Sequence, residues 1–416
     1  MWKMLLALTL LVPPTQQPRP LDWKPCFDSS PVAMQCADLA VPLAENGKRT
    51  ITLKVARLPA TGAGKGSVLA NFGGPKGDQI AALRSRPQIF DKIRQSMDVI
   101  TWDPRGCSGL SEPVLNCGFG FLRTPPLPKD RAEFDALAED NRIRRDKCRA
   151  NDPELYDHMD AGSDARDVEA IRIALGEKEM NFIGTSYGGV IAQSYARPFP
   201  QRVRAVYIDG SVPHHEQEWD RELDALMRRF FDQAAPGTEQ RWRALLAKAA
   251  REPIPAGTAR HDGMHLQRLG STMAWRGPAT WAQLATAIAA AEQGDASGFI
   301  PPGNPSPYPG TMGDQVKPCL DFPRPADHRE LSERIERLNR IAPNTGASFG
   351  PASHGQTVCA GLPAPVNPPK PLPRRLPPML GAGTWLDHGS TARVVDQVPG
   401  SRTTTTTAPA TTCSSA

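Results

Sequence analysis

Residues Met180–Tyr195 read MNFIGTSYGGVIAQSY, and this stretch decides the fold. An apolar run ending at Ile183 predicts a buried strand, and an apolar run starting at Val190 predicts a helix. Between them lies the motif Gly-x-Ser-x-Gly, with Ser186 at its centre. A serine in a sharp turn from strand to helix, flanked by small residues, takes a strained conformation that exposes its hydroxyl. The context therefore predicts a nucleophilic serine, although the motif alone also fits a glycine-rich structural turn.

Other apolar runs alternate with helical patterns along the first half of the chain. Strands are predicted at 39–43, 51–56, 67–72, 98–103, 180–184 and 203–210. Helical patterns separate the later strands, and the longest covers 130–177. A chain that alternates strands with helices in this way forms a mostly parallel sheet with right-handed crossovers. The sequence therefore predicts a large α/β core.

The pattern changes after Pro213. Helical patterns and two proline-rich spans follow, and strand character returns only at 379–383. We expect the intervening residues to form a large, mainly helical lid over the sheet. The expected segments are a signal peptide at 1–20, a core part at 21–213, the lid at 214–372, a core return at 373–402 and a low-complexity tail at 403–416.

The glycines that follow the strand at 67–72 can form an anion-binding turn. A serine nucleophile produces a tetrahedral oxyanion, which preorganised backbone N–H groups must hold. One donor is expected from Tyr187, the residue after the nucleophile, and the other from Gly74 in the segment Gly73–Pro75. The same segment also fits a plain tight turn or a phosphate-binding loop.

In a site of this kind, the acid and then the base follow the serine along the chain. Asp387 ends the apolar run that begins at Leu380 and is the candidate acid, with a solvated loop aspartate as the alternative. None of the eight histidines follows it at a usable distance. His388 is its immediate neighbour, and adjacent side chains on a strand end point apart. His214 and His215, which follow the strand after the serine, are the remaining candidates.

The charge composition argues against binding to nucleic acid. The chain has 49 basic and 44 acidic residues, and its net charge is +5. The basic residues are scattered and form no stripe interleaved with aromatic side chains, so we expect no nucleic-acid partner.

The N-terminus has the pattern of an export signal. Lys3 precedes the apolar run Met4–Val12, which is too short to span a bilayer. A frayed N-terminus is the alternative. The pattern predicts a secreted or periplasmic protein without a stable membrane span.

The eight cysteines agree with export, because disulfides persist in oxidising compartments. No close Cys-x-x-Cys pair has a second pair nearby, so no metal site is expected. Pairing near neighbours joins Cys26 to Cys36, Cys117 to Cys148 and Cys319 to Cys359, and leaves Cys107 and Cys413. Spacing alone does not fix this connectivity.

Four segments together resemble one group, the secreted bacterial tripeptidyl aminopeptidases of the proline iminopeptidase-like branch of α/β-hydrolases. NFGGPKGDQ (71–79) is similar to their oxyanion segment, and DVITWDPRGCSGLSEP (98–113) is similar to their Asp-Pro-Arg-Gly strand end. NFIGTSYGGVIAQSYARPFPQRVRAVYIDG (181–210) is similar to their nucleophile turn and the following strand. LPPMLGAGTWLDHGSTARVVDQVPGSR (376–402) is similar to the start of their acid-bearing subdomain. The local cysteine pairs and a W-x-x-L-A helix in the lid agree with this resemblance.

The resemblance implies an α/β-hydrolase fold and a serine exopeptidase that releases N-terminal residues or tripeptides from short peptides. Ser186 would attack, Asp387 would orient a histidine, and the amides of Gly74 and Tyr187 would hold the oxyanion, with no cofactor. An esterase acting on small esters is the alternative, since the fold does not fix the substrate. A non-catalytic chain is the third reading.

The chain departs from the family at two places. Phe72 and Lys76 replace the usual Pro and Gly beside the oxyanion turn. After Pro399–Ser401 the family has one further strand and then a Gly-His segment, where this chain has Thr403–Thr407. We therefore expect the last strand to be altered or missing and the base to be lost, through a frameshift or truncation rather than through degeneration into a pseudoenzyme.

Overall fold

The structure is a computed structural model that describes residues 20–27, 33–75, 77–117, 128–215, 219–299, 312–348, 357–384 and 387–405. The expected signal peptide up to residue 19, Lys76, His354, Cys413 and the tail beyond residue 405 lie outside these residues.

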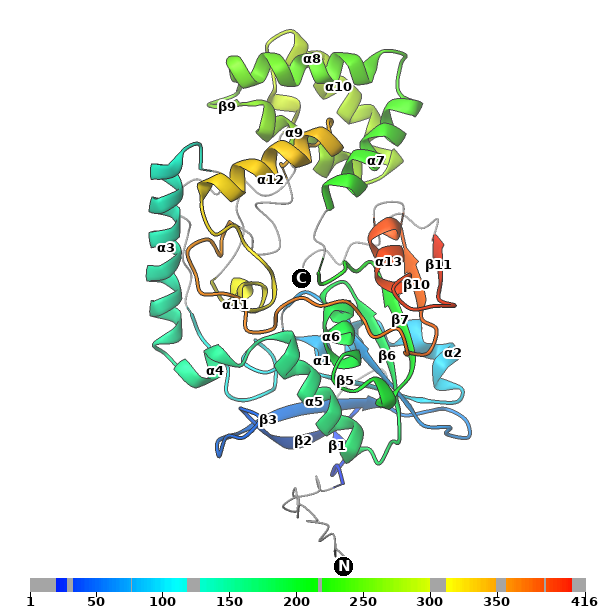
Figure 1. Ribbon diagram of the computed structural model, residues 1–416. Helices are drawn as coiled ribbons and strands as arrows, with labels where there is room; N and C mark the ends of the chain where they lie inside the picture. The colour runs from blue at the N-terminus through cyan, green and yellow to red at the C-terminus, as the bar shows by residue number, and fades with distance from the viewer. Residues whose placement is uncertain are drawn as a thin grey trace, which may run out of the picture.

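A nine-stranded sheet runs through the described part of the chain, in the order β1-β2-β3-β5-β4-β6-β7-β10-β11 (Figure 1). Its strands are β1 (Lys24–Pro25), β2 (Gln35–Pro42), β3 (Thr50–Leu58), β4 (Ser67–Asn71), β5 (Asp98–Trp102), β6 (Met180–Thr185), β7 (Val203–Asp209), β10 (Leu380–Gly383) and β11 (Arg402–Thr405). Strands β1, β2, β3 and β5 pair antiparallel, whereas β5, β4, β6, β7, β10 and β11 pair in parallel. The predicted mostly parallel sheet is confirmed.

Helices that follow the parallel strands complete the core. They are α1 (Gln79–Ser85), α2 (Asp91–Arg94), α5 (Ala161–Ala174), α6 (Tyr187–Ala196) and α13 (His388–Val395), with 3-10 turns η1 (Pro87–Phe90) and η2 (Pro200–Arg202). Every residue of β4 and of α6 is buried. Central parallel strands and their crossover helices are covered on both sides, which explains their continuous apolar runs. β6 lies between β4 and β7, so the turn that carries Ser186 follows a central strand of the sheet.

A second group of helices follows β7 in the chain, and all of them except the fifth, α11 (Met312–Asp321), stand apart from the sheet in Figure 1. It contains α7 (Trp219–Gln233), α8 (Thr238–Arg251), α9 (Gly263–Trp275), α10 (Trp281–Glu292), α11 and α12 (His328–Ile341), with 3-10 turns η3 (Pro278–Thr280) and η4 (Ser297–Phe299). A hairpin of β8 (Ile254–Ala256) and β9 (Ala259–His261) lies among them. The sequence does not predict this hairpin, because three-residue strands are too short to show a period of two.

One helix of the first core segment packs with this second group. α3 (Arg131–Arg149), followed by α4 (Pro153–Asp157), precedes β6 in the chain, yet α3 runs beside α11 and α12 (Figure 1). Phe134 and Ala138 of α3 form a small buried cluster with Leu331 of α12 and with Ala360. A helix of the expected core part thus packs against the expected lid, and the bounds of the two parts stay a prediction.

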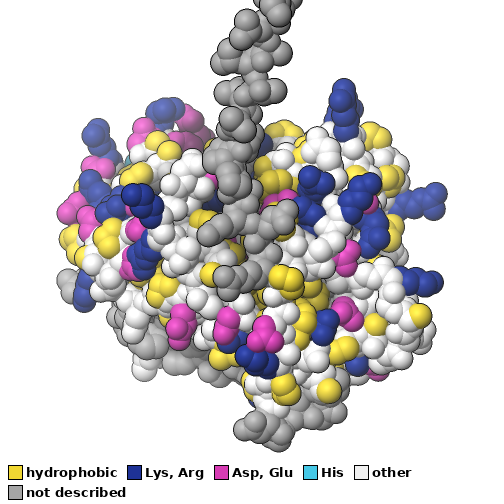
Figure 2. Space-filling model, turned by 90° about the horizontal axis from the view of Figure 1, so that it is seen from below, with side chains coloured by type: hydrophobic (Ala, Val, Ile, Leu, Met, Phe, Trp, Pro, Cys, Tyr) yellow, Lys and Arg dark blue, Asp and Glu magenta, His cyan; other side chains and the backbone are white. Residues whose placement is uncertain are grey.

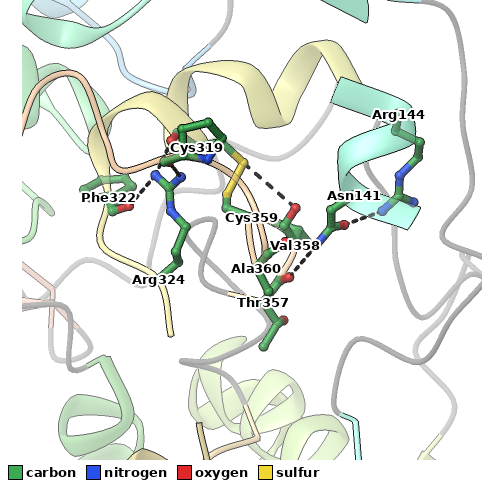
Figure 3. The surroundings of a disulfide bond; sticks show 10 residues. Asn141, Arg144, Cys319, Phe322, Arg324, Thr357, Val358, Cys359 and Ala360 are labelled. Carbon is green, nitrogen blue, oxygen red and sulfur yellow. Dashed lines mark hydrogen bonds between the residues drawn. A yellow bond between two sulfur atoms is a disulfide. The ribbon is translucent and has the colours of Figure 1, made fainter. Parts of the chain in front are cut away.

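Three disulfides join Cys26 to Cys36, Cys117 to Cys148 and Cys319 to Cys359, so the local pairing is confirmed. Figure 3 shows the third, which links the end of α11 to the turn at 357–360. Asn141 of α3 donates hydrogen bonds to the carbonyl oxygens of Thr357 at 2.9 Å and Ala360 at 3.0 Å. This disulfide turn is therefore fastened to α3.

Strand β11 corrects the expectation of a missing last strand. Arg402–Thr405 pair in parallel with Leu380–Gly383 over their whole length. Thr403, which the sequence assigns to the tail, thus belongs to the sheet. Threonine is β-branched and suits a strand, and the ladder needs only backbone groups.

The face of the molecule seen from below carries charges of both signs. Figure 2 shows Lys and Arg side chains interspersed with Asp and Glu on this face.

Among the helices of the described residues, none combines the length and the apolar character needed to cross a membrane.

Candidate active site

The turn between β6 and α6 holds Ser186 in a strained backbone conformation. Its φ is 52° and its ψ is −121°, and Asp78 is the only other non-glycine residue with positive φ in the described chain. Ser186 is exposed, whereas Tyr187 beside it is buried. Strain of this kind costs on the order of 1–3 kcal/mol and persists only where the surroundings enforce it. A strained, exposed serine between a strand and a helix is what a nucleophile elbow requires, and the role of Ser186 stays a prediction.

Glycines allow this turn to pack against its neighbours. A Cβ on Gly184 would lie 2.6 Å from the carbonyl oxygen of Gly188. A Cβ on Gly188 would lie 2.8 Å from the side-chain oxygen of Asn71, at the end of β4. Both distances are too short for real side chains, so close packing of β6, α6 and β4 requires glycine at both positions of the motif.

The loop after β4 lies directly against the serine turn. A Cβ on Gly73 would lie 2.8 Å from the Cβ of Ser186 and 3.0 Å from the amide nitrogen of Tyr187. The Gly73 N–H donates to Asn71 Oδ1 at 3.0 Å. The next amide along the loop belongs to Gly74, whose φ is 66°. The two expected oxyanion donors thus lie on segments that touch, and their role stays a prediction.

The side chain of Gln79 holds the loop after β4 through hydrogen bonds to its backbone. It is the first residue of α1, and its side chain is buried. Its Oε1 accepts a hydrogen bond from the N–H of Phe72 at 2.7 Å. Its Nε2 donates to the carbonyl oxygens of Gly73 at 3.0 Å and Gly77 at 3.3 Å. Sequence reasoning misses this residue, because a single amide side chain at a helix start gives no distinctive signal.

Asp387 lies between β10 and α13, at the carboxyl edge of the same sheet. Its Oδ1 accepts hydrogen bonds from the N–H of Thr384 at 2.5 Å and from the Thr384 hydroxyl at 3.0 Å. A Cβ on Gly210, the residue after β7, would lie 2.7 Å from Asp387 Oδ2. Burial raises the pKa of the Asp387 carboxyl, and the hydrogen bonds from Thr384 lower it. Between described residues, no hydrogen bond joins Asp387 to a histidine ring, so its role as the acid stays a prediction.

Strand β7 connects the serine turn to this carboxylate. The backbone carbonyl of Asp209, its last residue, accepts the N–H of Ser186 at 2.8 Å. The next residue, Gly210, donates its N–H to Ala382 of β10 at 3.1 Å. Burial and the nearby charge of Asp387 raise the pKa of the Asp209 carboxyl. Ser186 and Asp387 are thus held at one sheet edge through a single intervening strand.

His214 has a structural role that does not suit a general base. Its ring is fully buried. Its Nδ1 accepts from Arg197 at 2.8 Å, and its Nε2 lies 2.9 Å from the backbone carbonyl of Asp321. Burial, with the charge of Arg197, lowers the pKa of His214 to about 3. Both ring nitrogens are engaged, so the imidazole cannot also serve Ser186.

His388 and His215 are the other histidines that the sequence offers as the base. His388 begins α13 directly after Asp387, and no histidine follows it in the sequence. His215 is exposed at the surface. Among the described residues, no histidine ring is hydrogen-bonded to Ser186 or Asp387. Within the same ranges, no group of three or more His, Cys, Asp or Glu side chains is arranged to hold a metal ion.

The sequence matches the family model for the alpha/beta hydrolase fold over residues 84–294. The matched segment contains the serine turn and β7. It begins after the loop at Gly73 and Gly74 and ends before Asp387, so it covers Ser186 and Tyr187 but not Gly74 or Asp387.

Two curated bacterial peptidases are similar to part of the chain. The serine protease Hip1 of Mycobacterium tuberculosis is 33% identical over 220 residues, which cover 49% of this chain and 42% of that protein. The tripeptidyl aminopeptidase of Streptomyces coelicolor is 31% identical over 215 residues, which cover 48% and 39%. The matched part thus spans about two fifths of the length of these relatives.

Other relatives match over a longer stretch at lower identity. The carboxylesterase B of Mycobacterium tuberculosis is 26% identical over 406 residues, which cover 83% of this chain and 74% of that protein. The solved structure of a proline iminopeptidase from Mycobacterium smegmatis covers 89% of both chains with 17% identity and a TM-score of 0.38. A likeness at that score is too low to bear on function.

Proposed function

Because the chain belongs to the alpha/beta hydrolase fold family, we propose that it is a serine hydrolase that removes amino-terminal residues from short peptides. The observation that carries the proposal is the backbone of Ser186, with its positive φ of 52° between β6 and α6. Ser186 is exposed, so burial of its side chain does not account for the strain. It agrees with a side chain held ready for attack.

The proposed reaction proceeds through an acyl-enzyme. The Ser186 oxygen attacks the substrate carbonyl carbon while a general base takes the serine proton. The amides of Gly74 and Tyr187 donate hydrogen bonds to the oxyanion. The intermediate collapses, the amine leaves with the proton, and water hydrolyses the acyl group from Ser186. Asp387 orients the base and stabilises the charge that it gains.

The proposed reaction needs a nucleophile, an acid, two oxyanion donors and a general base. The described residues offer candidates for all of these except the base. In the order serine, acid, base, its place is after the acid, in the stretch beyond β11. Removing the base from such a triad costs about 10⁴–10⁶-fold in rate. A chain in which no residue takes the Ser186 proton is a non-catalytic relative, and turnover measurements separate the two cases.

An esterase is the second candidate function. The similarity to carboxylesterase B extends over 83% of this chain, a longer stretch than the similarity to either peptidase. The peptidases are more similar in sequence, at 33% and 31% against 26%. Both chemistries use the same elbow, so the geometry does not separate them. The higher sequence identity therefore favours the peptidase.

We infer that the protein works outside the cytoplasm, in the periplasm or secreted. Its three disulfides support this compartment, since cytosolic thiols are kept reduced.

A substrate panel tests the proposed function. Purified chain is given a tripeptide p-nitroanilide with a free amino terminus, the same peptide acetylated, and a p-nitrophenyl ester of a short fatty acid. An aminopeptidase cleaves the first and not the second, and Ser186→Ala abolishes the cleavage. Hydrolysis of the ester alone favours the esterase. Absence of turnover on all three contradicts an active hydrolase.

A further inference from the structure

Asp321, the last residue of α11, is a fully buried carboxylate in the middle of the molecule. Its Oδ1 accepts hydrogen bonds from the N–H of Ala161 at 2.9 Å and from the side-chain amide of Asn367 at 2.7 Å. Its Oδ2 accepts one from the hydroxyl of Tyr187. Ala161 begins α5 and Tyr187 begins α6. The carboxylate therefore joins the insertion to the start of two core helices.

Tyr187 carries two groups that matter at the serine turn. Its backbone amide is one of the two expected oxyanion donors, and its phenol reaches into the insertion. The ring of Phe322 meets the Tyr187 ring edge-on, with 6.1 Å between centroids. Residues 321 and 322 thus hold both the hydroxyl and the ring. A fixed side chain limits the freedom of the backbone that carries it, here the first residue of α6.

We propose that Asp321 is a positioning residue for the oxyanion hole, which acts through the Tyr187 hydroxyl to hold the Tyr187 amide in place. This inference rests on the proposed function, because an oxyanion forms only if Ser186 attacks a carbonyl. It makes the end of α11 a support for the chemical step. Loss of the contact therefore slows the reaction of bound substrate more than it weakens substrate binding.

The chain on both sides of Asp321 is well anchored. Cys319, two residues earlier, is bonded to Cys359. Arg324 donates to the carbonyl oxygen of Cys319 and, at 3.2 Å, to that of Phe322 (Figure 3). These contacts fix the backbone from which the Asp321 carboxylate reaches Tyr187.

Charged groups from three elements surround this carboxylate. Burial, and then the charge of Asp160 before α5, raise the pKa of Asp321 to about 7. Arg197 after α6 and Lys317 on α11 interact with it electrostatically. Lys317 is itself paired with Asp164 at 2.6 Å. A carboxylate buried in such surroundings adds little net stability compared with an apolar side chain. Its placement on Tyr187 is better explained by a role at the serine turn.

The test compares kcat and KM on a tripeptide p-nitroanilide for the wild-type chain, Tyr187→Phe, Asp321→Ala and the double variant. Each single change is expected to lower kcat about 10- to 100-fold while KM changes less than about threefold. The double variant is no slower than the slower single variant, because both remove one contact. Asp321→Asn keeps an oxygen acceptor for the phenol and retains more of kcat than Asp321→Ala.

Leu245→Ala is the control for a general loosening of the insertion. Leu245 is a buried residue of α8. Its truncation is expected to lower the melting temperature and to leave kcat unchanged. An unchanged kcat in Tyr187→Phe, or losses that multiply in the double variant, overturns the proposal.

Hydrogen exchange gives a readout that needs no turnover. If the wild-type chain hydrolyses no substrate, the proposed function fails, and deuterium uptake of a peptide covering 185–189 then decides the inference. Asp321→Ala and Tyr187→Phe are expected to raise this uptake above that of the wild type and of Leu245→Ala. Equal uptake in all four proteins overturns the proposal.

Discussion

Ser186 keeps its positive φ because hydrogen bonds fix the backbone on both sides. Its N–H is bound by Asp209 at 2.8 Å, and its carbonyl accepts the N–H of Gly189 at 2.9 Å. Without these hydrogen bonds the backbone would relax, since residues with a Cβ rarely adopt a positive φ. The strain is therefore maintained by the sheet and by α6.

Replacing Ser186 by glycine is expected to stabilise the fold relative to replacement by alanine. Glycine takes a positive φ without strain, whereas alanine keeps the Cβ, so Ser186→Gly should be more stable than Ser186→Ala by about 1 kcal/mol. Urea unfolding of the two inactive variants measures the difference. If the alanine variant is the more stable one, the backbone is not strained as described.

His214 is expected to make the fold sensitive to acid. Its pKa is lowered to about 3, against 6.5 for the ordinary group. Between these values the unfolded chain binds a proton that the native chain does not, so stability falls as the pH drops below 6.5, by up to about 1.4 kcal/mol per pH unit. His214→Gln should lose less stability between pH 7 and pH 4 than the wild type.

The comparison between variants isolates this residue. Asp321, with its pKa raised to about 7, contributes with the opposite sign in the same range. The difference between His214→Gln and the wild type is therefore the informative quantity. His158→Gln, which changes a histidine bonded to the nearby carbonyl of Glu154, serves as the control. Identical pH profiles for the wild type and His214→Gln would contradict the assignment.

At the scale of elements, the loop between β4 and α1 depends on the Gln79 side chain. Gln79→Glu keeps the acceptor for Phe72 but turns a carboxylate toward the carbonyl oxygens of Gly73 and Gly77. The lost donor leaves buried carbonyls unsatisfied, which costs about 1–3 kcal/mol. We expect kcat to fall by about tenfold or more, with KM little changed. Gln88→Glu, the same change at an exposed position, should leave kcat unaltered.

The local elements of this site are predictable from sequence, and their long-range supports are not. The turn at Ser186 is predicted by signals that are adjacent in the sequence. They are an apolar strand, two glycines and an apolar helix. The contact between Tyr187 and Asp321 joins residues 134 positions apart. The periodicity of a sequence does not predict a contact over such a distance. In the sequence, the buried Asp321 and Gln79 also look the same as polar residues at the surface. Thr403 shows the converse, because low-complexity composition hid a strand.

At the scale of the whole molecule, the insertion packs against the core part of the chain through α3, which lies beside α11 and α12 (Figure 1). Within the insertion, a disulfide joins Cys319 to Cys359. This bond closes a loop of sequence separation 40, against 10 for Cys26 and Cys36. A longer closed loop restricts the unfolded chain more.

Removing the longer disulfide is therefore expected to cost more stability. The pair Cys319→Ser and Cys359→Ser should lose about 2–5 kcal/mol of unfolding free energy, and roughly 1 kcal/mol more than the pair Cys26→Ser and Cys36→Ser. Denaturant unfolding under oxidising conditions measures both. A larger loss from the shorter loop would show that native contacts near Cys26, rather than chain restriction, dominate.

Covalent labelling of the serine tests the central claim most directly. The chain is treated with a fluorophosphonate, which forms a stable bond with an activated serine, and the labelled residue is located by mass spectrometry of peptides. A nucleophile elbow predicts a single adduct, on Ser186, that is lost in Ser186→Ala. A chain that takes up no label, or an adduct that persists on another residue in Ser186→Ala, would contradict the assignment of Ser186 as the nucleophile.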